Sequence, residues 1–215
     1  MFKKKAFFIT FEGIEGSGKS YKSEKLYNKI RKLKLPVIIT REPGGTIGAE
    51  KIRKIILTDY FHLNSKEQFD KYTDTLLYLA ARNEHIQKTI KPAILKKKII
   101  LCDRFVDSTL AYQVYGKKVN KNLVDLVHKR ILGKIKPNLT FVLKLNIAKA
   151  FKRINKRKYK NRYDRFSKKF YEKTQRAFVK IAKTNKKRYQ ILDSSKDTKE
   201  LENIIFKKVY YILSK

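Results

Sequence analysis

The sequence predicts an α/β fold in which a parallel sheet of five strands lies between layers of helices. Two observations predict it. Short apolar runs alternate with stretches of helical periodicity along the 215 residues, and a glycine-rich loop joins the first apolar run to the first helix. Such alternation is typical of parallel strands joined by helical crossovers on both faces of one sheet. Neither an internal repeat nor a linker appears, so residues 1–215 are expected to form a single domain.

Each expected strand is a short apolar run rich in β-branched and aromatic residues, bounded by a turn residue or a charge. The second and fourth begin at or just after a proline, and the third ends in an aspartate. The five runs are Ala6 to Phe11, Pro36 to Thr40, Lys98 to Asp103, Leu139 to Leu145 and Tyr189 to Leu192.

Helices are expected between these strands because apolar residues recur there at intervals of three and four. In the first helix, Leu26, Ile30 and Leu33 show this spacing. A long third helix is expected to end at Pro92, since proline lacks the N–H that a helix interior needs. The expected helices span residues 22–34, 47–57, 66–91, 107–115, 120–132, 147–156, 164–185 and 199–213, and an irregular basic stretch lies near 155–165.

The chain is strongly basic, with 54 Lys and Arg against 19 Asp and Glu and a formal net charge of +35. One interpretation is binding to nucleic acid or to an anionic surface. The other is composition bias, because 42 of the cations are Lys, only 12 are Arg, and Gly and Trp are scarce. Arg, the better bidentate partner of phosphates and bases, has not accumulated. We therefore expect no dedicated nucleic-acid binding.

Several classes of protein are excluded by composition. No apolar run reaches the roughly 18–20 residues that a membrane span needs. The basic start, Met1 to Lys5, is followed by a short apolar run and the glycine-rich loop without a small-residue cleavage site, which argues against a signal peptide. The single Cys102 excludes an internal disulfide and a cysteine metal cluster, and it is expected to be a buried, inert thiol. A reducing cytoplasmic location is expected.

The glycine-rich loop matches the P-loop pattern G-x-x-x-x-G-K-[ST], with a strand before it and a helix after it. Glycines let main-chain N–H groups turn toward phosphates at the positive end of a helix. Lys19 is expected to reach the β- and γ-phosphates of ATP, and the Ser20 hydroxyl to ligate Mg²⁺. The expected ATP-binding residues are Gly13, Ile14, Glu15, Gly16, Ser17, Gly18, Lys19 and Ser20.

The third strand ends in Asp103, which is expected to be a second oxygen ligand near Mg²⁺. The sequence thus predicts a P-loop NTPase fold. A GTPase would also need the guanine-reading pattern N-K-x-D, and none of the four Asn-Lys pairs continues in that way. These features favour a phosphotransferase that acts on a small metabolite.

Three further segments carry a resemblance to a known family. They are T-R-E-P-G-G-T at 40–46, Y-L-A-A-R at 78–82 and D-R-F-x-x-S-T-x-A-Y-Q at 103–113. Together with Glu15 in the P-loop, they resemble the signature set of thymidylate kinases, and the resemblance extends from Phe8 to the last helix. It implies transfer of the γ-phosphate of ATP to thymidine 5′-monophosphate (dTMP), which supplies dTTP for DNA synthesis. It also implies a homodimer.

The resemblance implies roles for residues that would meet the phosphate and sugar of dTMP. Arg41 and Arg104 present guanidinium groups suited to the acceptor phosphate, and both follow strand ends. Glu15 would accept a hydrogen bond from the sugar 3′-hydroxyl. Tyr112 would pack where a 2′-hydroxyl would clash, and Gln113 lines the same pocket.

The resemblance also implies a base pocket, and here alternatives remain open. Tyr78 occupies the position of the aromatic side chain that stacks on thymine, but it could be an ordinary core residue. Arg82 would address a base carbonyl, but it could be a surface ion-pair partner. Thr109 would help to read the base, and Glu42 is expected to stabilise its loop. The three histidines show no catalytic spacing and are assigned to the surface or to packing: His62, His85 and His128.

A short mobile lid is expected at about 152–166. The P-loop contains no Arg, so the chain resembles the members of the family that supply an arginine from this lid. Arg157 is the favoured candidate, Arg153 the second, and Arg162 and Arg165 are also available. The region departs from the family pattern: Lys144 stands where an acidic residue is usual, the proline after it is missing, and the lid is slightly longer.

Two other functions were weighed. One is a different deoxynucleotide or deoxynucleoside kinase, against which the base-pocket residues argue. The other is a basic ATPase that binds nucleic acid, since Lys152 to Arg188 holds 17 cations and 2 acids. No RNP, zinc-finger or helix-turn-helix signature accompanies that segment.

Overall fold

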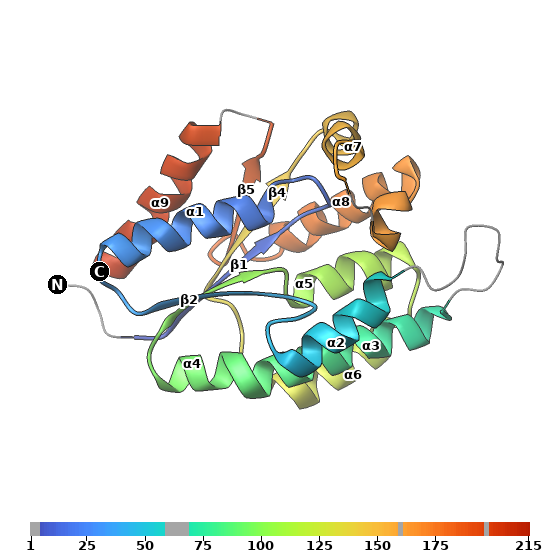
Figure 1. Cartoon of the computed structure of the whole chain (residues 1–215), viewed down its shortest axis with the longest axis horizontal. Coiled ribbons are helices and arrows are strands. Elements are labelled where there is room, and N and C mark those ends of the chain that lie inside the picture. The colour runs from blue at the N-terminus through green and yellow to red at the C-terminus, as the bar shows by residue number, and fades with distance from the viewer. Residues whose placement is uncertain (1–4, 59–68, 159–160, 196–197) are drawn as a thin grey trace.

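The computed structural model describes residues 5–58, 69–158, 161–195 and 198–215. Its centre is a five-stranded, fully parallel sheet with the order β2-β3-β1-β4-β5 (Figure 1). The predicted α/β class and the predicted sheet are confirmed. The strands are β1 (Phe7–Glu12), β2 (Val37–Arg41), β3 (Ile99–Asp103), β4 (Leu139–Lys144) and β5 (Tyr189–Asp193).

Helices cover both faces of the sheet (Figure 1). The helices are α1 (Lys19–Lys32), α2 (Ile47–Leu57), α3 (Lys71–His85), α4 (Lys91–Leu95), α5 (Val106–Thr109), α6 (Lys121–Leu132), α7 (Ile147–Asn155), α8 (Lys168–Lys183) and α9 (Thr198–Ser214). Two π-helical turns, Ile86–Ile90 and Leu110–Gly116, and a 3₁₀ turn, Arg162–Arg165, complete the described elements.

The alternation of side chains along β1 divides the core into two layers. Ile9 and Phe11 point toward α1 and α9 and pack with Leu26 and Ile30. Phe8 points to the opposite face and packs with Ile86 of the helical layer below. Because both faces are covered, nearly every residue of the central strands is buried, as parallel sheets require.

The strand register aligns the carboxyl ends of the central strands. Asp103 of β3 lies opposite Phe11 of β1 on one side and Arg41 of β2 on the other. The loops that follow these strands therefore start from one edge of the sheet, and ligands of open α/β sheets bind at that edge.

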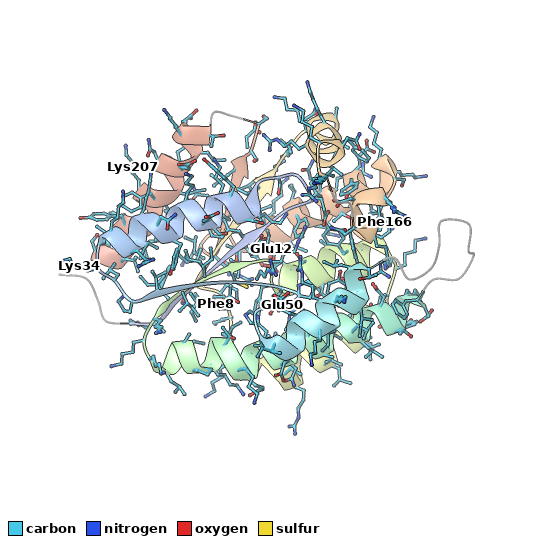
Figure 2. The ribbon with its side chains drawn as sticks, in the orientation of Figure 1. Phe8, Glu12, Lys34, Glu50, Phe166 and Lys207 are labelled. Atoms are coloured by element: carbon cyan, nitrogen blue, oxygen red, sulfur yellow. The ribbon has the colours of Figure 1, made fainter. Side chains whose placement is uncertain are left out.

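Most charged side chains lie outside this core. Figure 2 shows Lys34 and Lys207 on the periphery, whereas Glu12 lies in the interior beside the central strands, where it is fully buried. In the described part of the chain, no helix has the length and apolar character needed to cross a membrane.

Several element boundaries differ from the sequence-based expectation, the clearest at the starts of three helices. The first helix begins at Lys19 instead of residue 22, because Gly18, at φ +85°, turns the chain directly into the helix. The helix expected at 164–185 begins as an α-helix at Lys168, where the Ser167 hydroxyl caps it by accepting from the Phe170 N–H at 3.2 Å. The long helix, expected from residue 66, is helical from Lys71 among the described residues, because the Asp70 side chain caps it by accepting from the Tyr72 N–H; residues 59–68 are not described.

The expected stop at Pro92 is wrong. The helical path continues from α3 through the π-helical turn into α4, which ends at Leu95. Pro92 sits in the first turn of α4. At that position its missing N–H and its ring are tolerated, because the wider turn before it already breaks the regular α-helical hydrogen-bonding pattern.

Candidate functional site

The P-loop joins β1 to α1 at the carboxyl edge of the sheet, and its backbone conformation explains its glycines. Gly13 has φ +139°, and a Cβ there would lie 2.6 Å from the Leu143 carbonyl oxygen. Gly16 has φ +75° and lies against the backbone of Ala150. The sequence therefore needs glycine at both positions, and the loop presents its main chain at the N-terminus of α1, where anions bind.

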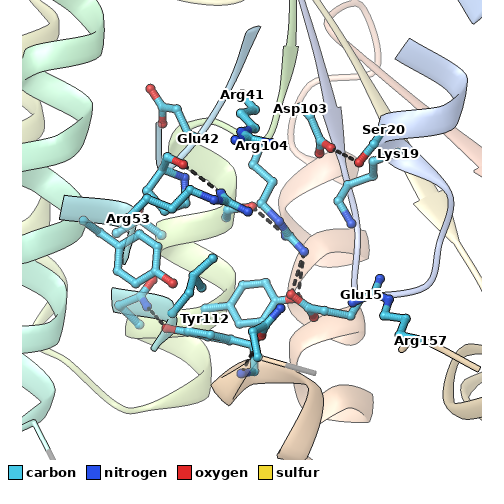
Figure 3. A pocket seen from close by; sticks show the side chains of 18 residues that line it. Glu15, Lys19, Ser20, Arg41, Glu42, Arg53, Asp103, Arg104, Tyr112 and Arg157 are labelled. Carbon is cyan, nitrogen blue, oxygen red and sulfur yellow. Dashed lines mark hydrogen bonds and ion pairs between the residues drawn. The ribbon is translucent and has the colours of Figure 1, made fainter. Parts of the chain in front are cut away.

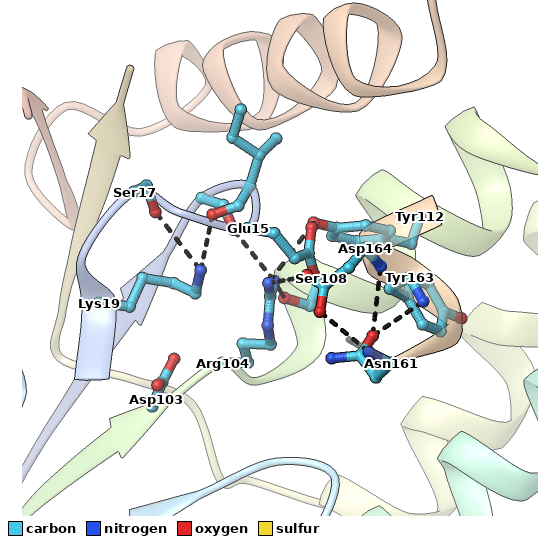
Figure 4. A network of polar contacts seen from close by, with 12 residues as sticks. Glu15, Ser17, Lys19, Asp103, Arg104, Ser108, Tyr112, Asn161, Tyr163 and Asp164 are labelled. Carbon is cyan, nitrogen blue, oxygen red and sulfur yellow. Dashed lines mark hydrogen bonds and ion pairs between the residues drawn. The ribbon is translucent and has the colours of Figure 1, made fainter. Parts of the chain in front are cut away.

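Lys19 lies inside this loop. Its Nζ donates to the Ile14 carbonyl at 2.8 Å and to the Ser17 hydroxyl at 3.4 Å (Figure 4). Burial lowers the pKa of Lys19 to about 8, and the positive charge of Arg104 lowers it further. The nearby carboxylates act in the opposite direction but do not outweigh these two effects. A phosphate group that reaches this amine would restore its preference for the charged form.

Ser20 and Asp103 meet at the start of α1 and the end of β3. The Ser20 hydroxyl donates to Asp103 Oδ2, and the other oxygen, Oδ1, is buried without a hydrogen-bond partner among the described residues. A buried carboxylate oxygen with no partner beside a hydroxyl is a donor set that suits Mg²⁺, which usually takes one or two protein ligands together with nucleotide phosphates. The residues present therefore fit the metal ion that the P-loop implies.

A cavity of about 180 Å³ opens beside the P-loop (Figure 3). It brings together side chains from β1–α1, β2, α3, α5 and the lid. Every acceptor-site residue expected from the sequence lines it except Arg82: Glu15, Arg41, Tyr78, Arg104, Thr109, Tyr112 and Gln113. Lys19, Ser20, Asp103 and Arg157 line it as well.

Arg104 lies at the centre of this cavity. It directly follows β3 and adopts a left-handed backbone conformation with φ +69°. Its guanidinium donates to Glu15 Oε1 at 2.7 Å, to the Gly13 carbonyl at 3.0 Å and to the Ser108 hydroxyl at 3.1 Å (Figure 4). These contacts fix the guanidinium next to the P-loop.

Glu15 is held between Arg104 and Tyr112, whose hydroxyl donates to Glu15 Oε2. Burial alone would raise the pKa of Glu15, but the charges of Arg104 and Lys19 outweigh it, so the pKa lies below its usual value. Glu15 is therefore an ionised acceptor that can receive a hydrogen bond from a ligand hydroxyl.

Arg41 lies at the mouth of the cavity and is paired with Glu50 of α2. Its Nε and Nη2 donate to the two Glu50 oxygens at 3.1 and 3.0 Å, and its side chain is 56% exposed. Glu50 also accepts from the Gly45 N–H at 3.0 Å, which joins the pair to the glycine turn after β2. The guanidinium thus faces the cavity from an exposed ion pair.

Arg82 lies behind the cavity wall, and only 2% of its surface is exposed, so the surface alternative is wrong. Its guanidinium donates to Glu42 at 2.7 Å, to the Phe105 carbonyl at 2.9 Å and to the Thr109 hydroxyl at 2.7 Å. The structure does not bring Arg82 into the cavity lining; it reaches the cavity through Thr109 and Glu42, which both line it.

Two of the histidines belong to the same buried network. His85 bridges the Thr40 hydroxyl at 2.7 Å and Glu42 at 2.9 Å, and His128 lies 2.8 Å from Arg82. Burial, with help from Arg82, lowers the pKa of His128 to about 3, so it is neutral. Both are interior residues, while His62 lies outside the described residues. Glu42 stabilises its loop, as expected.

The lid arginines lie on different sides of the P-loop. Arg157 lines the cavity and forms an ion pair with Asp164 at 2.6 Å. Arg153 donates to the Gly16 carbonyl at 3.0 Å and to the Ser194 carbonyl at 3.4 Å. It lines a second cavity of about 400 Å³ on that side, together with Gly16, Gly18, Tyr21, Lys22, Ser194, Thr198 and Leu201.

The sequence analysis missed three residues at the site. Glu12 is buried and accepts from the Phe105 N–H at 2.8 Å and the Ser108 hydroxyl at 2.6 Å, and burial raises its pKa to about 8. Arg53 and Tyr163 line the cavity. The sequence does contain a signal for Glu12, because a single carboxylate at the end of an apolar strand is unusual. No pattern in the sequence points to Arg53 or Tyr163.

The family model for thymidylate kinase matches residues 11–205. Thymidylate kinase of Mycoplasma capricolum subsp. capricolum is 39% identical over 198 residues, covering 91% of each chain. That of Sulfurihydrogenibium sp. is 38% identical over 199 residues, with 93% and 94% covered. The crystal structure of thymidylate kinase from Ehrlichia chaffeensis superposes with a TM-score of 0.71 at 30% identity, covering 97% of this chain and 99% of that one.

Proposed function

The chain belongs to the thymidylate kinase family, and we propose how its residues transfer the γ-phosphate of ATP to dTMP, giving dTDP. Its fold is that of the P-loop NTPases. One observation carries the assignment of roles: the cavity beside the P-loop gathers seven of the eight acceptor residues expected from the sequence, although they come from separate segments of the chain.

The acceptor would lie along this cavity from the P-loop outward. Its phosphate would meet Arg104, with Arg41 turning in from the mouth. Its sugar would lie against Glu15 and Tyr112, with the ionised Glu15 receiving the 3′-hydroxyl. Its base would lie against the ring of Tyr78, with the Thr109 hydroxyl, held by Arg82, at the far end.

The donor would lie on the other side of the P-loop. The phosphates of ATP would occupy the loop itself, where main-chain N–H groups and Lys19 receive them. The second cavity, lined by Gly16, Gly18 and Arg153, continues from that side and is large enough for the remainder of a nucleotide. The two nucleotides would then meet at Lys19, between the cavities.

We propose that Ser20 and Asp103 hold Mg²⁺ with the donor phosphates, as the buried unpaired oxygen of Asp103 supports. When bound, the ion supplies positive charge to the oxygens of the transferring phosphoryl group. The chain itself contributes position and charge. Two polyanions repel each other, and Lys19, Arg104, Arg41 and the lid arginines would offset this repulsion.

The ion pairs described above keep these cations in place before substrates arrive. Glu50 neutralises Arg41 and Asp164 neutralises Arg157, so each guanidinium is oriented and its charge is compensated. Phosphate oxygens compete with carboxylates for the same donors. Binding of the nucleotides would therefore draw Arg41 and Arg157 toward the phosphates, and we propose 152–166 as the lid that carries Arg157 in this movement within a single domain.

We also propose that the chain is a cytoplasmic homodimer. The cytoplasmic assignment rests on a single buried thiol, Cys102. The dimer is supported by large apolar side chains exposed on neighbouring helices of one layer: Ile47 on α2 is 83% exposed, Leu76 on α3 is 49% and Leu126 on α6 is 67%. Sedimentation of the wild type should give a dimer and that of Leu126→Glu a larger monomer fraction; a wild-type monomer would contradict the proposal.

The function is tested by an assay that couples ADP release to NADH oxidation, run with each deoxynucleoside monophosphate in turn. dTMP should stimulate ADP release far more than dCMP, dAMP or dGMP. Preference for another acceptor would indicate a different nucleotide kinase. ADP release that no acceptor stimulates would indicate an ATPase.

A further inference from the structure

Three polar side chains from three segments form a chain that ends at the base side of the cavity. The hydroxyl of Tyr163, in the lid, donates to Asp74 Oδ2 of α3 at 3.3 Å. The same hydroxyl accepts from the Gln113 amide nitrogen at 3.2 Å. Gln113 and Tyr163 both line the cavity, whereas Asp74 is fully buried behind it.

The direction of these hydrogen bonds is set by Asp74. The Asp74 oxygens accept from Lys117 and Arg162 as well, so the hydroxyl proton of Tyr163 points toward Oδ2. The lone pairs of that hydroxyl then face Gln113, which must present its N–H₂ group. The carboxamide of Gln113 is thereby oriented with its nitrogen at Tyr163 and its oxygen turned away from that hydroxyl.

The charge of Asp74 is held by two cations. Lys117 donates to Asp74 Oδ2 at 2.8 Å, and Arg162 of the lid forms an ion pair with Oδ1. Both cations donate to the Asp74 oxygens, so each of these oxygens acts as a hydrogen-bond acceptor. The orientation of Gln113 is therefore imposed from the interior and does not depend on solvent.

Tyr163 is also placed to contact the base through its ring. Its ring lies edge-on to that of Tyr78, with 6.1 Å between the centroids, and to that of Tyr112, with 5.6 Å. The rings of Tyr78 and Tyr112 thus both contact the ring of Tyr163, and all three residues line the cavity together with Gln113. The lid contributes to the acceptor pocket as well as to the phosphate side.

We propose that Tyr163 is a specificity-determining positioning residue: through the chain from Asp74 to Gln113, it fixes an acceptor oxygen against the N3 edge of the base. This rests on the proposed placement of dTMP. A base with an N3–H donor, thymine or uracil, satisfies that oxygen. Cytosine presents a lone pair at N3, so the two acceptors would face each other, and a buried unpaired acceptor is costly.

The test compares the wild type with Tyr163→Phe on three acceptors. Without the hydroxyl the Gln113 carboxamide can rotate and offer N–H to cytosine, so the ratio of kcat/KM for dTMP to that for dCMP should fall by about tenfold or more, the effect of one hydrogen bond. The ratio for dTMP to dUMP should stay unchanged, because both bases carry N3–H. An unchanged dTMP to dCMP ratio would overturn the proposal.

Tyr171→Phe is the matched control. Its hydroxyl donates to the Tyr163 carbonyl at 2.7 Å, so this variant also removes one buried tyrosine hydroxyl that contacts the lid, but Tyr171 does not line the cavity. Tyr171→Phe should leave both ratios as in the wild type. If it lowered the dTMP to dCMP ratio as much as Tyr163→Phe does, the effect would come from lid packing and the proposal would be wrong. A second variant, Asp74→Asn, removes the fixed polarity and should shift the dTMP to dCMP ratio in the same direction. Wild-type protein that fails to phosphorylate dTMP would contradict the proposed function instead.

Discussion

The guanidinium of Arg104 lies 2.7 Å from the carboxylate of Glu15, so the side chains proposed for the phosphate and for the sugar of dTMP are paired before dTMP binds. Arg104 reaches this position from a left-handed residue after β3, and Glu15 from the P-loop. The pair therefore ties the acceptor site to the donor loop. A substrate that engages both residues is positioned relative to the P-loop as soon as it binds.

Replacing Arg104 should abolish turnover while the fold remains. Arg104→Ala should lower kcat/KM for dTMP by about 100- to 1,000-fold, the effect of losing one preorganised donor to a reacting phosphate. Arg104→Lys should recover little of it, since one ammonium cannot reach Glu15, Gly13 and Ser108 together. The control is Lys121→Ala, which breaks only an exposed pair on α6. Near-normal rates in Arg104→Ala, with a normal thermal melt, would refute the role.

The affinity for ATP should depend on the charge of Lys19. Burial lowers its pKa to about 8 in the free protein, so the amine is charged below that pH and neutral above it. Calorimetric titration with a non-hydrolysable ATP analogue should show affinity falling as the pH rises through 8, by up to about tenfold per pH unit. Lys19→Met should bind weakly and without this decline. Parallel pH curves for the two proteins would contradict the assignment.

Buried and exposed ion pairs at the site should differ in their contribution to stability. Arg82→Ala leaves the buried Glu42 without its cationic partner and with only the His85 contact, and it should lower the free energy of unfolding by about 3–5 kcal/mol. Arg41→Ala breaks an exposed pair with Glu50 and should cost less than about 1 kcal/mol. Urea unfolding measures both. Equal losses would mean that the Arg82 network does not support the site as described.

The two lid arginines should have separable effects. Arg157 lines the acceptor cavity, so Arg157→Ala should mainly lower kcat, by about 100-fold if it meets the transferring phosphate. Arg153 lies against Gly16 and Ser194 on the donor side, so Arg153→Ala should mainly raise KM for ATP. Steady-state kinetics with each substrate varied in turn distinguish the two. The reverse pattern would exchange their roles.

Local signals made much of the fold and site predictable. The P-loop, the strand ending in Asp103 and the arginines after strand ends each follow from a few neighbouring residues, and the structure places them at one edge of the sheet. Arg82 could not be placed in this way. Its burial depends on Glu42, Thr109 and Phe105, which are distant in sequence and meet only when the helices pack.

The lid and the helix that continues through Pro92 also could not be predicted from local sequence. Periodicity cannot reveal a π-helical turn, because the extra residue is accommodated by packing beneath the sheet. Tyr163 looked like one aromatic residue in a basic stretch, and its place in the acceptor cavity depends on Asp74 and Gln113. Residues that act through partners far along the chain need the structure to be recognised.

The most direct test of the account follows the phosphoryl group itself. ATP labelled in its γ-phosphate is incubated with dTMP and Mg²⁺, and the labelled products are separated and identified. The account predicts labelled dTDP formed in step with ADP, at a rate that Lys19→Met and Arg104→Ala both reduce to near background. Release of the label as inorganic phosphate, or its transfer to another deoxynucleotide in preference to dTMP, would contradict it.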